Sequence, residues 1–255
     1  MCTRAVCGLA HLLEREGIPT ALIGAIRDHV ALLRPPRALV VPFELGRPFG
    51  APDAPEFQRR VLSDVLVLME RTDGPILVDF PDGPPAPPAR LERWSPPPET
   101  ARPDRAPRDP AALAAAIRSE IARLRPLRDL WVRAHGGRHF DRITGLDPDG
   151  IVALIIAYTG DRSIANPQPQ YALERTIKFA ADDLKHFYYQ AGLSRPGQIT
   201  DIELDNWFFG ATLAGEMLLR LRAALLGSDD ADLRRFGETS LVPSHQAHRT
   251  PQSLG

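Results

Sequence analysis

The chain has 255 residues, of which 44% are hydrophobic and 25% are charged, so it can bury one or two ordinary cores. Its 31 basic and 32 acidic residues nearly cancel, which gives no support for binding to nucleic acid or to an anionic membrane surface. Apolar runs stay below the roughly 18 residues that a membrane span needs, and the N-terminus lacks a signal-peptide pattern, so we expect a cytoplasmic protein.

Helical and strand patterns alternate over the first 80 residues. An apolar stripe predicts a first helix that stops at Gly17. Short apolar runs predict buried parallel strands at residues 20–26, 37–43 and 76–78, with helices between them at 27–33 and behind Pro55. This order predicts an α/β fold over residues 1–80, with a partial doubly wound parallel sheet that is Rossmann-like but lacks its first strand.

The rest of the chain changes character. Residues 81–108 are rich in proline and predict a semi-rigid linker, in which Trp94 suggests that the segment packs back onto a neighbour. Residues 109–243 follow a purely helical pattern and predict an all-α helical bundle. A capping box at residues 200–203 introduces a long helix from Leu204 to Leu226, and residues 244–255 predict a disordered tail.

Three segments resemble one known family. Residues 2–6 (CTRAV), 17–20 (GIPT) and 34–50 (RPPRALVVPFELGRPFG) resemble the selenoprotein B family of glycine, sarcosine, betaine and D-proline reductases. In that family a selenocysteine or cysteine, two intervening residues and a second cysteine lie just ahead of this helix. Cys2 matches the second cysteine, and the first redox residue would then lie two residues upstream of Met1. Because a selenocysteine codon also reads as stop, we expect an N-terminally truncated product with an uncovered strand edge beside Cys2. We expect this truncated product to be inactive, because a two-electron reduction needs both members of the redox pair.

The resemblance implies a thiol- or selenol-dependent reductase that cleaves C–N bonds. It implies a small amino-acid-like substrate, a thioredoxin-type reductant and other reductase subunits as partners. It also implies no cofactor beyond the redox-active selenocysteine or cysteine expected upstream of Met1, and it makes Cys2 the catalytic thiol of this sequence.

The residues themselves leave the role of the two cysteines open. A helix N-terminus stabilises a thiolate, which favours a reactive Cys2. The alternative is that Cys2, without its partner, is merely an exposed residue at a frayed terminus. Cys7 falls close to the apolar face of the first helix and is predicted to lie in the core.

The loop after the predicted strand at 37–43 supplies candidate substrate-binding residues. In open α/β sheets, ligands bind beyond the carboxyl ends of the strands. Arg47 could bind a carboxylate and Glu44 an amine or ammonium, which would suit an amino-acid-like substrate. The alternative is a structural turn whose glycines permit positive φ and in which Arg47 and Glu44 pair with each other. No glycine-rich dinucleotide fingerprint or phosphate loop is present.

In the helical half, Asp182, Asp183 and His186 have the spacing that places carboxylates and an imidazole on one helix face. Metal sites in bundles normally use two such copies on different helices, and the sequence holds no second copy, so we predict no metal. Further carboxylates could come from Glu203, Asp205 and Glu216, but exposed acidic positions such as these are ordinary. The alternative to an enzyme is a non-enzymatic adaptor, in which a degenerate α/β half supports a partner-binding helical bundle.

Overall fold

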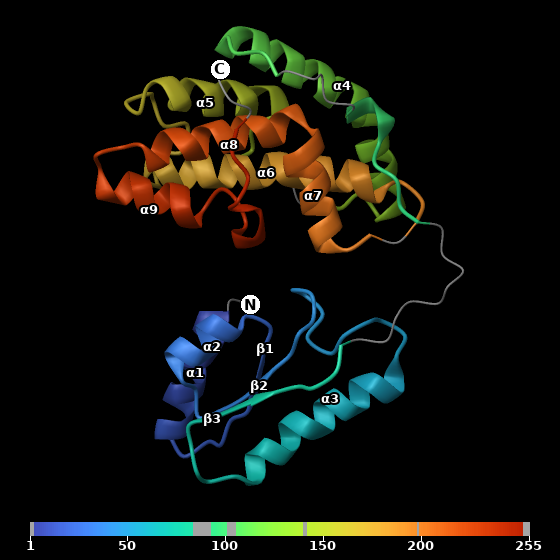
Figure 1. Cartoon of the computed structure of the whole chain (residues 1–255), viewed down its shortest axis with the longest axis vertical. Coiled ribbons are helices and arrows are strands. Elements are labelled where there is room, and N and C mark those ends of the chain that lie inside the picture. Colours follow the sequence, from blue (N-terminus) through green and yellow to red (C-terminus); the bar gives the residue numbers. More distant parts are fainter. Residues whose placement is uncertain (1–2, 84–92, 101–105, 140–141, 198, 252–255) are drawn as a thin grey trace. The chain divides into compact units, whose positions relative to one another are not determined.

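The computed structural model describes residues 3–83, 93–100, 106–139, 142–197 and 199–251. The chain divides into two compact units, Met1–Leu91 and Glu92–Gly255 (Figure 1). We call them the α/β unit and the helical unit, and describe each by itself.

The α/β unit has the element order that the sequence predicts. Its elements are α1 (Thr3–Arg15), β1 (Leu22–Gly24), α2 (Arg27–Leu33), β2 (Arg37–Val40), α3 (Pro55–Val67), the 3-10 turn η1 (Leu68–Glu70) and β3 (Ile76–Asp79). The strands pair in parallel in the order β1-β2-β3, with Gly24, Val40 and Asp79 in register at their carboxyl ends. The expected α/β class with a parallel sheet is therefore confirmed, although each of the first two strands is shorter than the apolar run that predicted it.

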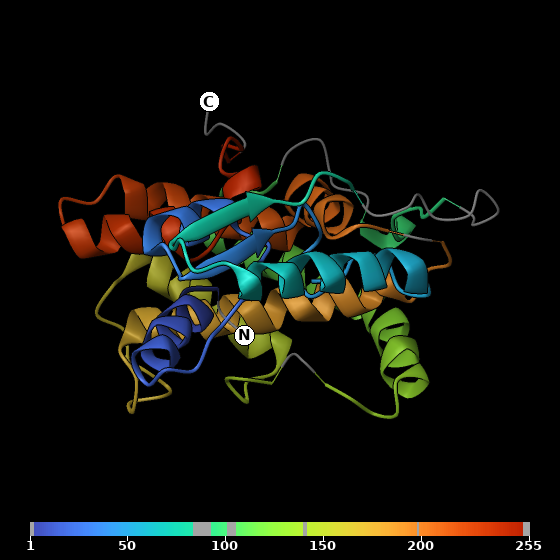
Figure 2. The ribbon, with the colours of Figure 1, turned by 90° about the horizontal axis from the view of Figure 1, so that it is seen from below.

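Helices cover both faces of this sheet. Side chains alternate along β2, so Ala38 and Val40 pack with α1 and α2, while Leu39 and Val41 pack with α3. Figure 1 shows α1 and α2 on one face and α3 on the other, and Figure 2 shows α3 running alongside the strands. In a doubly wound sheet the strand order reverses at a switch point, and the described strands show no such reversal. The doubly wound, Rossmann-like arrangement therefore stays a prediction.

The helical unit is built mainly from six α-helices among its described residues. They are α4 (Pro110–Ala134), α5 (Pro148–Gly160), α6 (Leu173–Leu193), α7 (Asp201–Ala211), α8 (Leu213–Leu226) and α9 (Ala231–Thr239), with 3-10 turns η2 (Pro98–Thr100) and η3 (Ser244–Gln246). The caps follow the sequence, since Asp109, Asp147 and Thr200 each accept a hydrogen bond from a first-turn N–H. Helix α6 packs against α4, α5 and α7, and one large apolar cluster fills the space between the helices.

Part of the proline-rich segment belongs to the helical unit. The indole of Trp94 donates to the carbonyl of Gly192 at 3.0 Å, and its ring meets that of Trp207 edge-on, with centroids 6.0 Å apart. The indole of Trp207 in turn donates to Thr100 Oγ1 at 2.9 Å. Residues 93–100 are thus anchored on helices α6 and α7, which confirms that Trp94 packs back and shows that this part of 81–108 is not a linker.

The long helix expected from Leu204 to Leu226 is wrong, because the chain breaks at Thr212. This residue is extended, with φ −120° and ψ 149°, and its hydroxyl accepts a hydrogen bond from the N–H of Gly215 at 3.0 Å. A Cβ on Gly215 would lie 2.1 Å from the carbonyl oxygen of Phe208, so only glycine permits the two helices to meet so closely. Two helices, α7 and α8, therefore replace the single one.

Residues 244–251 also differ from the disordered tail expected at 244–255, whereas residues 252–255 lie outside the described residues. Residues 244–246 form η3, and Gln246 is buried. The Gln246 amide donates to Asn206 Oδ1 of α7 at 2.8 Å, and Leu241 and Val242 join the core. The polar residues after Pro243 predict disorder by composition, but their partners lie on a helix that is distant in sequence.

Candidate functional site

The carboxyl edge of the parallel sheet is the candidate site, and helix α1 begins there. At the opposite end of α1, Glu14 forms an ion pair of 2.6 Å with Arg37, the first residue of β2. The first turn of α1 lies by the carboxyl edge, because Arg4 Nη2 is 3.3 Å from the ring of His29, and His29 is in the first turn of α2, just after the carboxyl end of β1. Helix α1 therefore runs antiparallel to the strands and presents its N-terminal turn to the edge where ligands bind in such sheets.

The structure describes only the second of the two cysteines. Cys2 lies outside the described residues, and its assignment as a catalytic thiol stays a prediction. Cys7 is fully buried in the cluster that α1 and α2 form with the sheet, as predicted for a core residue. Burial away from water makes Cys7 a poor nucleophile compared with an exposed thiol.

Glu44 and Arg47 lie in the turn that leaves β2 and pair with each other. Arg47 Nη1 is 3.2 Å from Glu44 Oε2, and the Arg47 N–H donates to the Glu44 carbonyl at 3.0 Å. Gly46 and Gly50 both have positive φ, near 89° and 88°. This is the pairing that the structural-turn alternative describes. Both charged groups remain partly exposed, however, so the pair is open to exchange with a charged ligand.

A second ion pair at this edge was missed in the sequence. Arg27, the first residue of α2, donates from Nε and Nη2 to the two carboxylate oxygens of Asp79, at 2.9 and 3.0 Å. The hydrogen bonds from Arg27 hold the pKa of the Asp79 carboxyl below its ordinary value. Asp79 is the last residue of β3 and Arg27 follows β1 by three residues. Their positions at or just after the ends of predicted strands were the only sequence feature that could have indicated this pair.

An aromatic trio lies at the start of α3 and beyond the ends of β2 and β3. The rings of Phe43, Phe57 and Phe80 have centroids 5.5 to 5.7 Å apart. The guanidinium of Arg60 lies 5.3 Å from the centroids of Phe57 and Phe80 and pairs with Asp82. The trio forms an apolar base beside the charged pairs of this edge.

The opposite edge of the sheet carries a shallow surface depression. It is lined by His11, Leu32, Arg34, Pro36 and Pro75, among others, where the chain enters β2 and β3. Its lining has no matched pair of opposite charges, and no group in it follows a strand end. We therefore retain the carboxyl edge as the candidate site, on the ground that the charged pairs are there.

The candidate metal-ligand face of α6 is otherwise occupied. The Asp182 carboxylate pairs with Lys178 and Lys185, and although burial alone would raise its pKa, these two lysines lower it. The buried Asp183 carboxylate accepts from the N–H groups of Ile143 and Thr144, both at 2.8 Å. Within the described residues, no cluster of three or more His, Cys, Asp or Glu side chains is suited to a metal ion.

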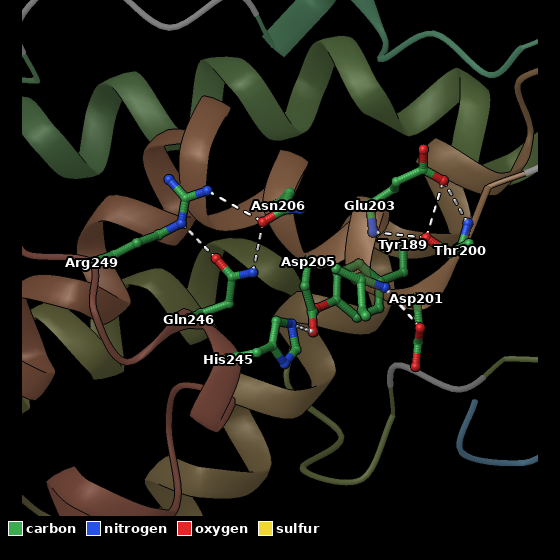
Figure 3. A network of polar contacts seen from close by, with 10 residues as sticks. Tyr189, Thr200, Asp201, Glu203, Asp205, Asn206, His245, Gln246 and Arg249 are labelled. Atoms are coloured by element: carbon green, nitrogen blue, oxygen red, sulfur yellow. Dashed lines mark hydrogen bonds and ion pairs between the residues drawn. The ribbon is translucent and has the colours of Figure 1, made fainter. Parts of the chain in front are cut away.

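Asp205 takes part in a network that ties the C-terminal segment to α6 and α7 (Figure 3). The Tyr189 hydroxyl donates to Asp205 Oδ1, and His245 Nε2 lies 3.1 Å from Oδ2. Burial raises the pKa of Asp205 in spite of the hydrogen bond from Tyr189. Next to it, Arg249 donates to Gln246, which donates to Asn206. The network anchors the segment, and both oxygens of Asp205 are already engaged.

Other acidic groups of the helical unit also have structural partners. Glu203 completes the capping box with Thr200. The expectation that Glu216 is exposed is wrong, because its side chain is fully buried and pairs with Arg220 at 3.0 Å. Glu120 of α4 is buried as well, and its partners lie on other helices.

The carboxylate of Glu120 lies at the break between α7 and α8 and binds the start of α8. Its carboxylate accepts from the Tyr188 hydroxyl at 2.8 Å and from the N–H of Leu213, the first residue of α8, at 3.0 Å. Burial raises the pKa of Glu120 to about 7, against the lowering effect of these hydrogen bonds. Because α4 is distant in sequence, no local pattern pointed to this interaction.

In comparisons with known proteins, no protein-family model, curated protein or solved structure matches this chain. In the parts of the chain that the structure describes, none of the helices is long and apolar enough to cross a bilayer.

Proposed function

We propose that this chain is a thiol- or selenol-dependent reductase-like protein that binds a small amino-acid-like substrate at the carboxyl edge of its sheet. One observation carries the proposal. The N-terminal turn of α1, the Glu44–Arg47 pair and the Arg27–Asp79 pair all lie at that edge. The resemblance to the selenoprotein B family supplies the reaction class, and this juxtaposition supplies its physical support.

The chemistry assigned to the residues is as follows. Arg47 binds the substrate carboxylate through two parallel hydrogen bonds, and Glu44 binds the ammonium group. Cys2, which directly precedes the first residue of α1, is assigned as the second thiol of the redox pair, since a helix N-terminus favours a thiolate. In reductive C–N cleavage the thiol or selenol pair supplies two electrons and two protons, so that the C–N bond breaks, the carbon gains a C–H bond, the amine leaves as its ammonium ion, and the pair ends as a disulfide or selenide-sulfide. A thioredoxin-type partner then reduces that bond.

The proposal also covers the fold type of each unit and the cellular location. The α/β unit represents part of a Rossmann-like doubly wound sheet, which is supported by helices on both of its faces. The helical unit represents a bundle that docks other reductase subunits. A cytoplasmic location suits a thiol that must return to its reduced state.

Thiol alkylation tests the proposal, because trypsin cleaves after Arg4 and so separates Cys2 from Cys7. We expect iodoacetamide at pH 7 to alkylate Cys2 at least about tenfold faster than the buried Cys7, since reactivity follows thiolate fraction and access. Saturating glycine, sarcosine or D-proline should slow the reaction at Cys2. A rate at Cys2 that none of these ligands changes would contradict a shared site.

A further inference from the structure

Arg27 and Asp79 form a fork-to-fork ion pair whose position in the sheet is unusual. Asp79 is the last residue of β3 and Arg27 lies three residues after the end of β1, and these two strands are not neighbours. Each pairs with β2, which separates them by about 10 Å, twice the usual strand spacing. The pair therefore spans the carboxyl end of the central strand.

This position coincides with the place where open parallel sheets bind ligands. The backbone already joins the three strands there, because Val41 N donates to the Gly24 carbonyl at 2.9 Å and Phe80 N donates to the Val40 carbonyl at 2.7 Å. The ion pair is thus not needed to hold the strand ends together. Both side chains are more than half exposed, so water and salt screen their attraction and a charged ligand can compete for either partner.

We infer that Arg27 and Asp79 form a zwitterion-binding subsite that opens when a ligand inserts between them. The ligand carboxylate takes the place of Asp79 on Nε and Nη2 of Arg27, and Asp79 accepts N–H hydrogen bonds from the ligand's ammonium group. One charge-assisted pair is exchanged for two. This inference rests on the proposed function and deepens it: Arg27 shares the substrate carboxylate with Arg47, and Asp79 shares the ammonium group with Glu44.

The chemistry of Asp79 also defines the ligand class. A carboxylate binds a cation best when that cation donates hydrogen bonds, as primary and secondary ammonium groups do. A quaternary ammonium group has no N–H, and its usual binding site is an open aromatic face. The nearby rings of Phe43, Phe57 and Phe80 contact one another and Arg60, so they do not replace that interaction. The subsite therefore selects amino acids such as glycine and sarcosine over betaine.

Binding of glycine, sarcosine and betaine to the full chain tests this inference, measured by NMR titration of backbone amides. The variants are Arg27→Gln and Asp79→Asn. Matched controls are Arg71→Gln and Asp73→Asn, because Arg71 and Asp73 form an equally exposed forked ion pair just before β3, at the opposite edge of the sheet. We expect each test variant to weaken glycine binding at least about tenfold, the controls to leave it unchanged, and betaine to bind at least about tenfold more weakly than glycine.

The outcomes separate the subsite from the wider proposal. If Arg47→Gln abolishes glycine binding while Arg27→Gln and Asp79→Asn do not weaken it, the subsite is overturned and the proposed function stands. Betaine binding as tight as glycine binding would overturn the selectivity and, with it, the role of Asp79. If none of the three probes binds the unmodified chain, both the subsite and the proposed function fail. Amide spectra of the variants that match those of the unmodified chain exclude misfolding as the cause of a loss.

Discussion

The charged side chains at the carboxyl edge of the α/β unit differ from the buried carboxylates of the helical unit. In the α/β unit, Arg27, Asp79, Glu44 and Arg47 form pairs at the end of the sheet that remain partly exposed to water. In the helical unit, carboxylates such as Asp183 are buried and bound to backbone and hydroxyl donors. An exposed pair can exchange its partner for a ligand, whereas a buried carboxylate cannot leave its donors without a large penalty. The comparison motivates the proposal that ligands bind in the first unit, whereas the buried carboxylates of the second unit stabilise its fold.

The largest effect is expected from Asp183→Ala. This change leaves the buried N–H and hydroxyl groups of Thr144, and the N–H of Ile143, without their acceptor, which we expect to lower the free energy of unfolding by about 3 to 5 kcal/mol. Urea unfolding followed by tryptophan fluorescence measures it, because all three tryptophans belong to the helical unit. The neighbouring Asp182→Ala is the control, with an expected loss of about 1 kcal/mol, since its lysine partners reach water. Equal losses in the two variants would contradict the distinction.

The next effect is a pH dependence caused by Glu120. Its folded-state pKa of about 7 exceeds the ordinary 4.5, so the folded chain holds this proton more tightly than the unfolded chain. The resulting stabilisation is present below pH 4.5 and is lost as the pH rises through 7. We expect it to amount to at most about 3 kcal/mol, at about 1.4 kcal/mol per pKa unit.

Glu120→Gln isolates this contribution, because an amide keeps an acceptor for Leu213 N and Tyr188 but does not titrate. Unfolding free energies of the two proteins measured from pH 4.5 to 8 should converge or cross as the pH rises. A constant difference between them over that range would mean that Glu120 does not titrate in the folded chain within it.

A smaller effect is expected from Trp94→Phe. The change removes the hydrogen bond to the Gly192 carbonyl and keeps most of the ring contact with Trp207, so we expect a loss of about 1 kcal/mol. Trp94→Ala should cost more, about 2 to 3 kcal/mol, because the ring contact is lost as well. Unfolding followed by circular dichroism checks both. No change in either variant would show that residues 93–100 behave as a linker after all.

The smallest effect on stability is expected from Arg27→Gln. The exposed pair with Asp79 is screened by water, so the urea midpoint of the α/β unit should not change measurably. Amide signals of β1 and β2 report on that unit, which contains neither tryptophan nor tyrosine. A marked loss of stability would make the pair a structural brace and remove the contrast between the two units.

The sequence predicts the elements well where local patterns determine them. The apolar runs located β1, β2 and β3, and the capping residues Asp109, Asp147 and Thr200 located helix starts. The break at Thr212 escaped prediction because it depends on Glu120 of a different helix and on the close approach of Phe208 to Gly215. Propensity alone gives no reason to divide that apolar helix.

The candidate site was predictable only in part, for a similar reason. Glu44 and Arg47 are three residues apart in one loop, so their pairing was available as an alternative from the sequence. Arg27 and Asp79 are 52 residues apart, and only the parallel register of β1, β2 and β3 brings them together. A sequence pattern without strand order does not contain that pairing.

The central claim, that the carboxyl edge of the α/β unit is the binding site, is tested most directly by mapping glycine-induced amide shifts on the full chain. The account predicts shifts concentrated at residues 24–28, 42–50 and 79–82, with none in the core of the helical unit. Saturable shifts confined to the helical unit, or to the depression around His11 and Pro75 at the opposite edge of the sheet, would contradict it.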